Sequence, residues 1–257
     1  MTHLRERIRN GETVLGAFIK SASHHVSEVL GHAGLDFAIV DAEHAPFGIG
    51  DIDRVMLGAR SANLSCFVRP PDHAPAFINR CLDLGAAGIV APHVTDAECA
   101  RRLIAAMKYA EGQRGFSPST RAGGYGALAA SAYRAKADAE TSLWCQIEDA
   151  FALAHLDAIA KVEGVDCFFL GRADLALSLG VERNDDPKMK SAIAAIADAA
   201  RRNNIAFGLY IGEASEIPAF LPLGASVFVC GSDQSYLLAQ GRANRAALVR
   251  ALGEKPS

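Results

Sequence analysis

The sequence is poor in cysteine, which argues against a small fold held together by disulfides. Six cysteines occur among 257 residues, and no two of them form a C-x-x-C pair. Disulfide-stabilised secreted modules are shorter and richer in cysteine. Most of these cysteines lie in apolar runs such as Asp166–Leu170, where cysteine behaves as a small buried hydrophobe. We therefore expect structural thiols rather than metal-binding or redox cysteines.

Long hydrophobic runs are also missing. No stretch approaches the ~18 uncharged apolar residues that a membrane span needs. The first ten residues, Met1–Asn10, are charged throughout and lack the apolar core of a signal peptide. We therefore expect a cytoplasmic protein with no membrane partner.

An excess of positive charge is absent as well. The 26 Lys and Arg residues are slightly outnumbered by 29 Asp and Glu residues, which gives a net charge of -3. A nucleic-acid-binding protein normally shows a basic excess, so we expect no nucleic-acid partner. The 50% apolar content excludes a disordered chain, which would have fewer apolar residues and more net charge.

Short apolar runs alternate with amphipathic stretches along the whole chain. The runs are near-continuous rather than alternating, which is typical of parallel strands covered on both faces. The predicted strands are Val14–Lys20, Asp36–Asp41, Ser65–Arg69, Gly88–Pro92, Leu143–Ile147, Asp166–Leu170, Ala206–Ile211 and Ser226–Cys230.

Helical patterns lie between these runs. One helix places an apolar stripe on a single face, and its members are Ile52, Val55, Met56 and Ala59. We expect Asp51 to cap this helix, and Thr95–Glu98 to form a capping box before a helix through Met107. Glycines that suit the left-handed turn at a helix end precede several strands, namely Gly34, Gly85, Gly164 and Gly224.

Eight strands alternating with helices over about 250 residues predict an α/β protein of the (β/α)8 TIM barrel type. The competing fold is an open doubly wound sheet, which usually has a glycine-rich dinucleotide loop after its first strand. Here the first strand runs into Ser21–His25, which contains no such loop. No Pro/Gly/Ser linker divides the chain, so we expect residues 1–257 to form one domain.

One interval is longer than a single helix requires. Between the fourth and fifth predicted strands we expect an insertion over about residues 109–140, with glycine-rich sequence followed by alanine-rich helical sequence. Long loops in compact domains are usually functional or disordered. We expect this insertion at the active-site rim or at a subunit interface.

In such a barrel the active site lies at the C-terminal ends of the strands, and polar residues gather at these positions here. Glu148 and Asp174 follow adjacent predicted strands. Two such carboxylates can hold a divalent cation, and oxygen ligands favour Mg²⁺, Mn²⁺ or Co²⁺. The alternative for each acid is a helix cap or an ion pair.

Four further residues are candidates for the chemistry or for its support. Arg69 ends the third strand and could direct its guanidinium group at a carbonyl or carboxylate oxygen, or form a salt bridge with a barrel acid. His44 could act as a general base near neutral pH, or be structural, and Asp83 could orient it. His93 follows the fourth strand, and its role stays open.

Several of these segments together resemble the metal-dependent pyruvate (2-keto acid) aldolases, the family of 4-hydroxy-2-oxoheptanedioate aldolase and 2-dehydro-3-deoxyglucarate aldolase. They occur in family order over nearly the whole chain. The matching segments are Phe37–Pro46, Phe67–Pro70, Leu82–Ala86, Ile89–Pro92, Gln146–Glu148 and Val162–Leu175.

The resemblance implies roles for individual residues and an assembly. Glu148 and Asp174 would bind the metal, Arg69 would contact the keto oxygen, and His44 would be the base with Asp83 behind it. Substrate would lie against Gln146, with its carboxylate held by backbone amides of Gly171–Asp174. The family is usually a hexamer, so we expect a homo-oligomer.

The implied activity is the reversible cleavage of 4-hydroxy-2-oxo acids to pyruvate, or a similar 2-keto acid, and an aldehyde through an enolate. Alternatives are a CoA-ester lyase of the citrate lyase β-subunit type, a non-catalytic keto-acid-binding barrel, and a metal-assisted isomerase or epimerase. The chain has Gly171-Arg-Ala-Asp174 where relatives commonly have Gly-Pro-Ala-Asp, and Tyr210 where they tend to be apolar. The arginine could add an anion contact or alter the carboxylate pocket, and these departures leave the aldehyde partner open.

Overall fold

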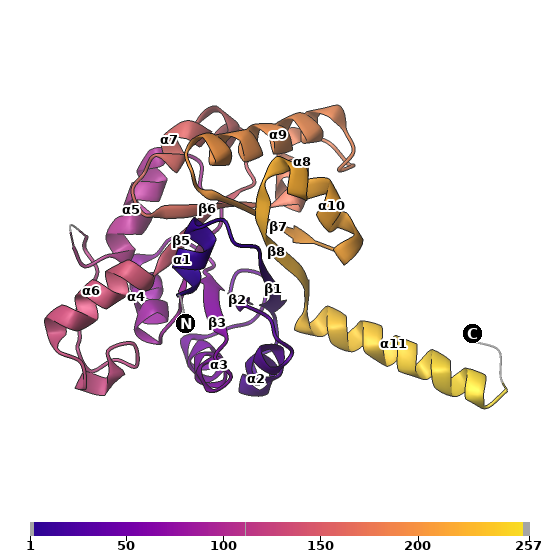
Figure 1. Ribbon diagram of the computed structural model, residues 1–257, viewed down its shortest axis with the longest axis horizontal. Coiled ribbons are helices and arrows are strands. Elements are labelled where there is room, and N and C mark those ends of the chain that lie inside the picture. The colour runs from indigo at the N-terminus through magenta and orange to yellow at the C-terminus, as the bar shows by residue number, and fades with distance from the viewer. Residues whose placement is uncertain (1–2, 111, 254–257) are drawn as a thin grey trace.

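The chain forms a closed barrel of eight parallel strands that pair in chain order, and the last strand pairs with the first (Figure 1). The computed structural model describes residues 3–110 and 112–253. The strands are β1 (Val14–Ile19), β2 (Phe37–Asp41), β3 (Ser65–Arg69), β4 (Gly88–Ala91), β5 (Ser142–Ile147), β6 (Val165–Leu170), β7 (Ala206–Ile211) and β8 (Ala225–Ser232). All eight predicted strands are confirmed, with ends that differ by at most two residues.

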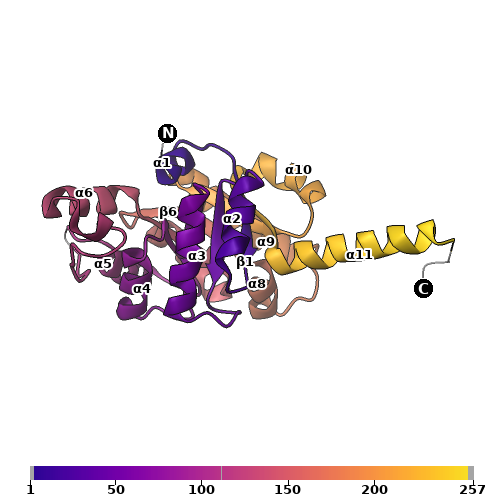
Figure 2. The ribbon, with the colours of Figure 1, turned by 90° about the horizontal axis from the view of Figure 1, so that it is seen from below.

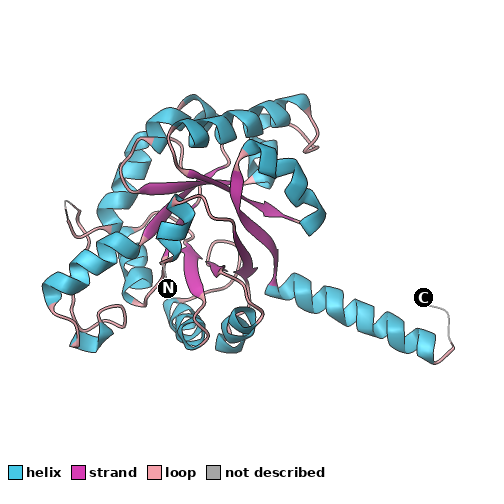
Figure 3. Cartoon of the chain, in the orientation of Figure 1, coloured by secondary structure: helices cyan, strands magenta, loops and turns pink. Residues whose placement is uncertain are grey.

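Helices surround the strands (Figure 3). They are α1 (Leu4–Arg9), α2 (His24–His32), α3 (Ile49–Ser61), α4 (Pro75–Asp83), α5 (Ala97–Met107), α6 (Ala130–Glu140), α7 (Leu156–Ala160), α8 (Arg172–Leu179), α9 (Pro187–Arg202), α10 (Ile217–Phe220) and α11 (Asp233–Ala251). Short 3-10 turns complete the connections, namely η1 (Gly124–Gly126), η2 (Ala150–Ala154), η3 (Ala214–Glu216) and η4 (Leu221–Leu223). The predicted (β/α)8 barrel is therefore confirmed.

The barrel interior is packed with aromatic rings. Trp144 lies 4.1 Å from Phe67, 5.2 Å from Phe37 and 6.1 Å from Phe169, measured between ring centroids. A Cβ atom on Gly16 would come within 2.5 Å of the Phe37 ring, so the aromatic layer requires glycine at this position. A larger apolar layer fills the space between the strands and the surrounding helices. Both faces of the sheet are thus buried, as the continuous apolar runs predict.

The ends of the helices differ in detail from the prediction. The apolar stripe of α3 faces the core, but α3 begins after Gly48, and Asp51 lies in its first turn with its carboxylate accepting from the Gly48 amide. In α5 the N-cap is Asp96, whose carboxylate accepts from the Cys99 amide at 2.7 Å. The predicted caps at Asp51 and at Thr95 were therefore wrong by one to three residues. A carboxylate satisfies free amides at the N-cap, and it can also do so from the first turn.

The segment of about residues 109–140 lies between α5 and β5 and ends in α6. Its polar contacts are with the outer helices and with the N-terminal ends of the strands. Arg121 pairs with Asp53 on α3, and Arg114 Nη2 donates to Asp83, the last residue of α4, at 2.9 Å. Lys108, just before the segment, donates through Nζ to the carbonyl oxygens of Asp138 and Thr141. This places the segment away from the C-terminal ends of the strands, while its expected role at a subunit interface stays a prediction.

The last helix, α11, does not pack back onto the barrel. It follows β8 and projects away from the barrel in both Figure 1 and Figure 2, and none of its described side chains is buried. Its first residue is fixed, because Asp233 accepts from the amides of Lys20 and Ser21 at 2.8 and 3.1 Å. Beyond that point Leu237 and Leu248 are 78% and 66% exposed.

The cysteines lie where the apolar runs of the sequence predict. Five of the six cysteines are buried, and burial raises the pKa of the Cys66 thiol to about 12. Among the described residues, no helix combines the length and apolar character that a membrane span requires.

Candidate active site

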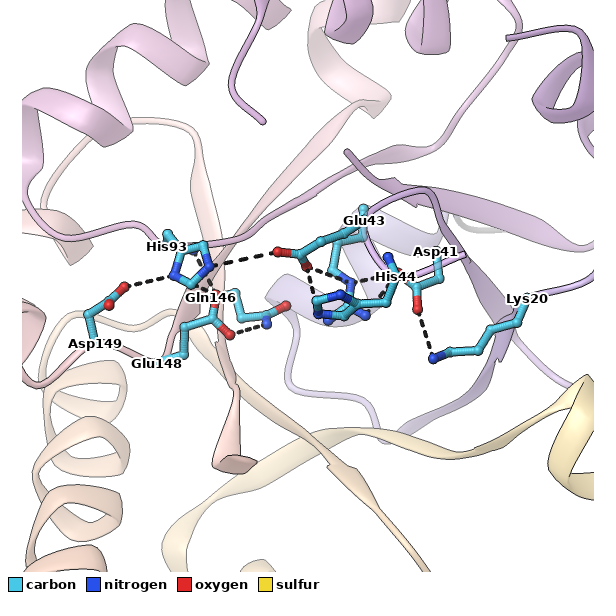
Figure 4. Close-up of polar contacts among 9 residues, drawn as sticks. Lys20, Asp41, Glu43, His44, His93, Gln146, Glu148 and Asp149 are labelled. Carbon is cyan, nitrogen blue, oxygen red and sulfur yellow. Dashed lines mark hydrogen bonds and ion pairs between the residues drawn. The ribbon is translucent and has the colours of Figure 1, made fainter. Parts of the chain in front are cut away.

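Polar side chains from several strands gather at the C-terminal end of the barrel (Figure 4). They come from the ends of β1, β2, β3, β4 and β5. Of the residues singled out from the sequence, His44, Arg69, His93, Gln146 and Glu148 are among them, and Asp174 lies in the first turn of α8.

Arg69, the last residue of β3, is held by two carboxylates. Its Nη2 and Nε lie 2.9 and 3.1 Å from Asp41 Oδ1, and its Nε lies 3.2 Å from Glu43 Oε2. The guanidinium carbon is 4.8 Å from the centroid of the Phe18 ring. The Arg69 side chain is only 8% exposed. The two carboxylates compensate its charge, and their contacts fix the direction of its guanidinium group.

Asp41 also pairs with Lys20, whose Nζ lies 3.1 Å from Oδ2. Burial raises the pKa of the Asp41 carboxyl, but Arg69, the His44 amide and Lys20 together lower it further, so that it lies below its usual value. Lys20 was not singled out from the sequence. Because it follows β1 at the same end of the barrel, the inspection of strand ends could have found it.

Glu148 follows β5 and is only 1% exposed. It accepts a hydrogen bond from Gln146 Nε2 and one of 2.8 Å from the His93 amide. Burial raises the pKa of the Glu148 carboxyl, and these hydrogen bonds offset only part of that rise. A Cβ atom on Gly171 would come within 2.4 Å of Glu148 Oε2, so the start of α8 lies directly against this carboxylate.

The first turn of α8 contains the other predicted contact residues. Ala173 and Asp174 follow Gly171, the N-cap of α8. Amides at the start of a helix have no acceptor within the helix, and they favour an anion. The predicted carboxylate cradle at Gly171–Asp174 therefore has suitable backbone geometry beside Glu148.

The oxygen atoms of this site fit a divalent cation. Glu148 is a buried carboxyl group, and the buried Gln146 Oε1 accepts no hydrogen bond from the described residues. Within the described part of the chain, no group of three or more His, Cys, Asp or Glu side chains is arranged to hold a metal by itself. Glu148 and Asp174 would thus supply two oxygen ligands and leave positions for a substrate, as hard cations accept.

His93 lies between Glu43 and Asp149, and its backbone has a left-handed conformation (φ 50°). Its Nδ1 is 3.1 Å from Asp149 Oδ2, and its Nε2 is 3.7 Å from Glu43 Oε1. Burial lowers the pKa of His93, but Asp149, Glu148 and Glu43 raise it more, so it lies above its ordinary value. Non-glycine residues with a left-handed backbone are uncommon, and those that occur are concentrated at functional sites.

His44 lies at the opening, and the acid beside it is Glu43. His44 Nε2 is 3.6 Å from Glu43 Oε2, and about half of its side chain is exposed. Asp83, expected behind His44, is the last residue of α4, at the opposite end of the barrel, and accepts from Arg114 Nη2 at 2.9 Å. Within one chain the structure does not bring Asp83 to His44, and its role stays a prediction.

Comparison with known proteins identifies one family that matches most of the chain. The sequence profile of the HpcH/HpaI aldolase/citrate lyase family matches residues 14–239. The hydroxypyruvate/pyruvate aldolase of Roseobacter denitrificans is 34% identical over 241 residues, 93% of each chain. The 2-dehydro-3,6-dideoxy-6-sulfogluconate aldolase of Pseudomonas putida is 35% identical over 231 residues, 88% of this chain and 89% of its own.

A solved structure gives the same result for the fold. The crystal structure of an HpcH/HpaI aldolase/citrate lyase family protein from Burkholderia cenocepacia J2315 superposes with a TM-score of 0.89 and 29% identity. The match covers 96% of this chain and 98% of that one. The resemblance seen in the sequence is confirmed, together with the class of enzyme that it implies, a carbon–carbon lyase of the aldolase type. The chain belongs to the HpcH/HpaI aldolase/citrate lyase family.

Proposed function

We propose that this protein is a divalent-metal-dependent aldolase that reversibly cleaves 4-hydroxy-2-oxo acids to pyruvate, or a similar 2-keto acid, and an aldehyde. The observation that carries the proposal is the arrangement of charge across the barrel opening. A buried carboxylate, Glu148, lies against the start of α8 on one side, and the fixed guanidinium group of Arg69 lies on the other. A 2-keto acid offers a carboxylate and a keto oxygen to such a site.

Each group would have a separate task in binding. The amides of Ala173 and Asp174 would hold the substrate carboxylate at the N-terminus of α8. Arg69 would donate to the keto oxygen, where negative charge develops in the transition state. Mg²⁺, Mn²⁺ or Co²⁺ held by Glu148 and Asp174 would supply additional positive charge beside the same oxygen.

Cleavage then requires one proton transfer on each side of the broken bond. His44 would accept the proton of the C4 hydroxyl group as the C4 carbonyl forms. The C3–C4 bond breaks, and its electron pair becomes the enolate of pyruvate. Protonation at C3 completes the release of pyruvate, and Glu43 beside His44 would stabilise the protonated imidazole.

Retro-aldol cleavage can be followed directly by a lactate-dehydrogenase-coupled assay on a panel of 4-hydroxy-2-oxo acids. The assay is run with EDTA and with added Mg²⁺, Mn²⁺ or Co²⁺. We expect pyruvate release that EDTA abolishes and a divalent cation restores. Absence of pyruvate with every metal and substrate would refute the aldolase, whereas activity that survives EDTA and exhaustive dialysis would refute the metal.

The relatives reported above are named aldolases, which favours keto-acid cleavage over the CoA-ester lyase alternative. We further propose that the chain works in the cytoplasm as a homo-oligomer, with a hexamer as the expected form. The support for assembly is α11, whose leucines contact nothing in the described chain that buries them. An isolated helix is marginally stable in water unless it packs against a partner.

A further inference from the structure

Arg172, the first residue of α8, points away from the carboxylate cradle. Its Nη1 lies 2.6 Å from Glu216 Oε2, and its Nη2 donates to the carbonyl oxygen of Tyr210 at 2.9 Å. The guanidinium carbon is 5.5 Å from the centroid of the Phe220 ring. The side chain is 15% exposed. Arg172 therefore joins the start of α8 to the end of β7 and to the loop that follows it.

Glu216 lies in this loop and binds two of its backbone amides. Its Oε1 accepts from the amide of Gly212 at 2.6 Å and from the amide of Glu213 at 3.3 Å, while Oε2 binds Arg172. Burial raises the pKa of the Glu216 carboxyl, but Arg172 and these amides together bring it below its usual value. The pair is thus ionised at neutral pH, and residues 212–216 are folded around one carboxylate.

Tyr210, whose carbonyl oxygen accepts a hydrogen bond from Arg172, has its side chain in the barrel opening. Tyr210 pairs in register with Val229, an interior residue of β8, and it is the exposed member of β7. Its ring centroid is 6.0 Å from that of Phe18. Phe18 in turn supports Arg69. Tyr210 therefore forms part of the wall beside the proposed keto-oxygen contact.

We propose that Arg172 is a positioning residue for the aldehyde half of the substrate, and that it acts by fixing the Tyr210 wall and the 212–216 loop through Glu216. The Glu216 carboxylate and the Tyr210 carbonyl oxygen hold its guanidinium group toward β7, so we assign it no direct contact with the substrate. The inference rests on the proposed aldolase function. Because the α8 amides and Arg69 already account for the polar atoms of pyruvate, the Tyr210 wall is left for the aldehyde half. Arg172 is therefore assigned to the choice and affinity of the aldehyde, and not to pyruvate activation.

Two reactions separate these roles. Exchange of the pyruvate methyl protons with D₂O, followed by NMR with Mg²⁺, reports enolate formation without an aldehyde. Aldol addition of pyruvate to glycolaldehyde and to propionaldehyde reports both halves. We compare Arg172→Met, Arg172→Lys and Glu216→Gln with Arg202→Met, which breaks the exposed pair of Arg202 and Asp157 (2.9 Å) on the outer helices.

We expect Arg172→Met to raise the KM for at least one of the two aldehydes about 10-fold, with kcat and pyruvate exchange within about 3-fold of wild type. Glu216→Gln should give the same pattern, Arg172→Lys should recover part of the loss, and Arg202→Met should change nothing. Placed in a Tyr210→Ala background, Arg172→Met should add little, because both substitutions disturb one wall.

Wild-type KM values in both Arg172→Met and Glu216→Gln would overturn the inference. So would an equal loss of exchange and addition, since Arg172 would then act on the pyruvate half. If Arg172→Met does not fold, the Glu216→Gln result decides alone. A wild-type enzyme that catalyses neither reaction would instead refute the proposed function itself.

Discussion

Single residues at the barrel opening are fixed mainly by opposite charges. Asp41 binds Arg69 and Lys20, and Arg69 also binds Glu43. A buried pair of this kind is costly to form, because both charges leave water, and more costly to break, because one charge is then left uncompensated. The site thus holds Arg69 in one direction before any substrate arrives.

Replacing Asp41 by Asn should lower the free energy of unfolding by about 3 kcal/mol at neutral pH, because Arg69 and Lys20 lose their shared partner. The pKa of Asp41 in the folded state lies below the ordinary value of 3.8. Its contribution is therefore complete above that value and is lost as the pH falls through the folded-state pKa.

Urea unfolding of both proteins between about pH 7 and pH 2.5 measures this difference. The two curves of unfolding free energy against pH should lie a constant distance apart above about pH 5 and should converge below. A difference that stays constant down to the lowest pH would show that Asp41 is not the titrating group.

Gly171 should not tolerate alanine. Its φ of −89° is ordinary, so the reason is steric, since a Cβ atom would come within 2.4 Å of Glu148 Oε2. Moving this carboxylate by a few tenths of an ångström to 1 Å should lower kcat by about 100-fold. Gly50→Ala in α3 is the matched control, because a Cβ atom there meets nothing within 4 Å. Equal activity of Gly171→Ala and wild type would refute the close approach.

At the scale of helices and strands, most of the structure follows from the sequence pattern. Eight continuous apolar runs predict the strands, because a strand with both faces buried leaves no room for alternation. The predicted helix starts differ from the observed ones because any of several neighbouring side chains can bind the free amides of a helix. Asp51 does so in α3, and Asp96 does so in α5. The placement of the 109–140 segment depends on long-range contacts such as Arg121 with Asp53, which no local pattern reveals.

The exposed helix α11 leads to a prediction about the assembly of the protein. Replacing both Leu237 and Leu248 by Glu should lower the mass of the assembly, because these side chains are exposed in the single chain and need a partner to be buried. Light scattering after size-exclusion chromatography measures the mass. Leu237→Met with Leu248→Met is the control and should keep the wild-type assembly. An unchanged mass in the Glu variant would remove α11 from the interface.

For the whole molecule, the barrel explains why residues distant in sequence form one site. Parallel strands end at the same rim, so Arg69, Gln146 and Glu148 could be placed together from sequence alone. The partner of His44 could not be placed in this way. Asp83 was the expected partner, and the structure puts it at the other end of the barrel, bound to Arg114. The contacts of Arg172 were equally hidden, because its direction depends on packing against α10.

The central claim is that the strand-end site forms an enolate of pyruvate with the help of a metal held by Glu148. Deuterium exchange at the pyruvate methyl group, measured by NMR for wild type and Glu148→Gln with Mg²⁺ and with EDTA, tests it most directly. We predict exchange only in the wild-type protein with Mg²⁺, and a loss of at least about 100-fold in the variant. Exchange at the wild-type rate in Glu148→Gln, or in the presence of EDTA, would contradict the account.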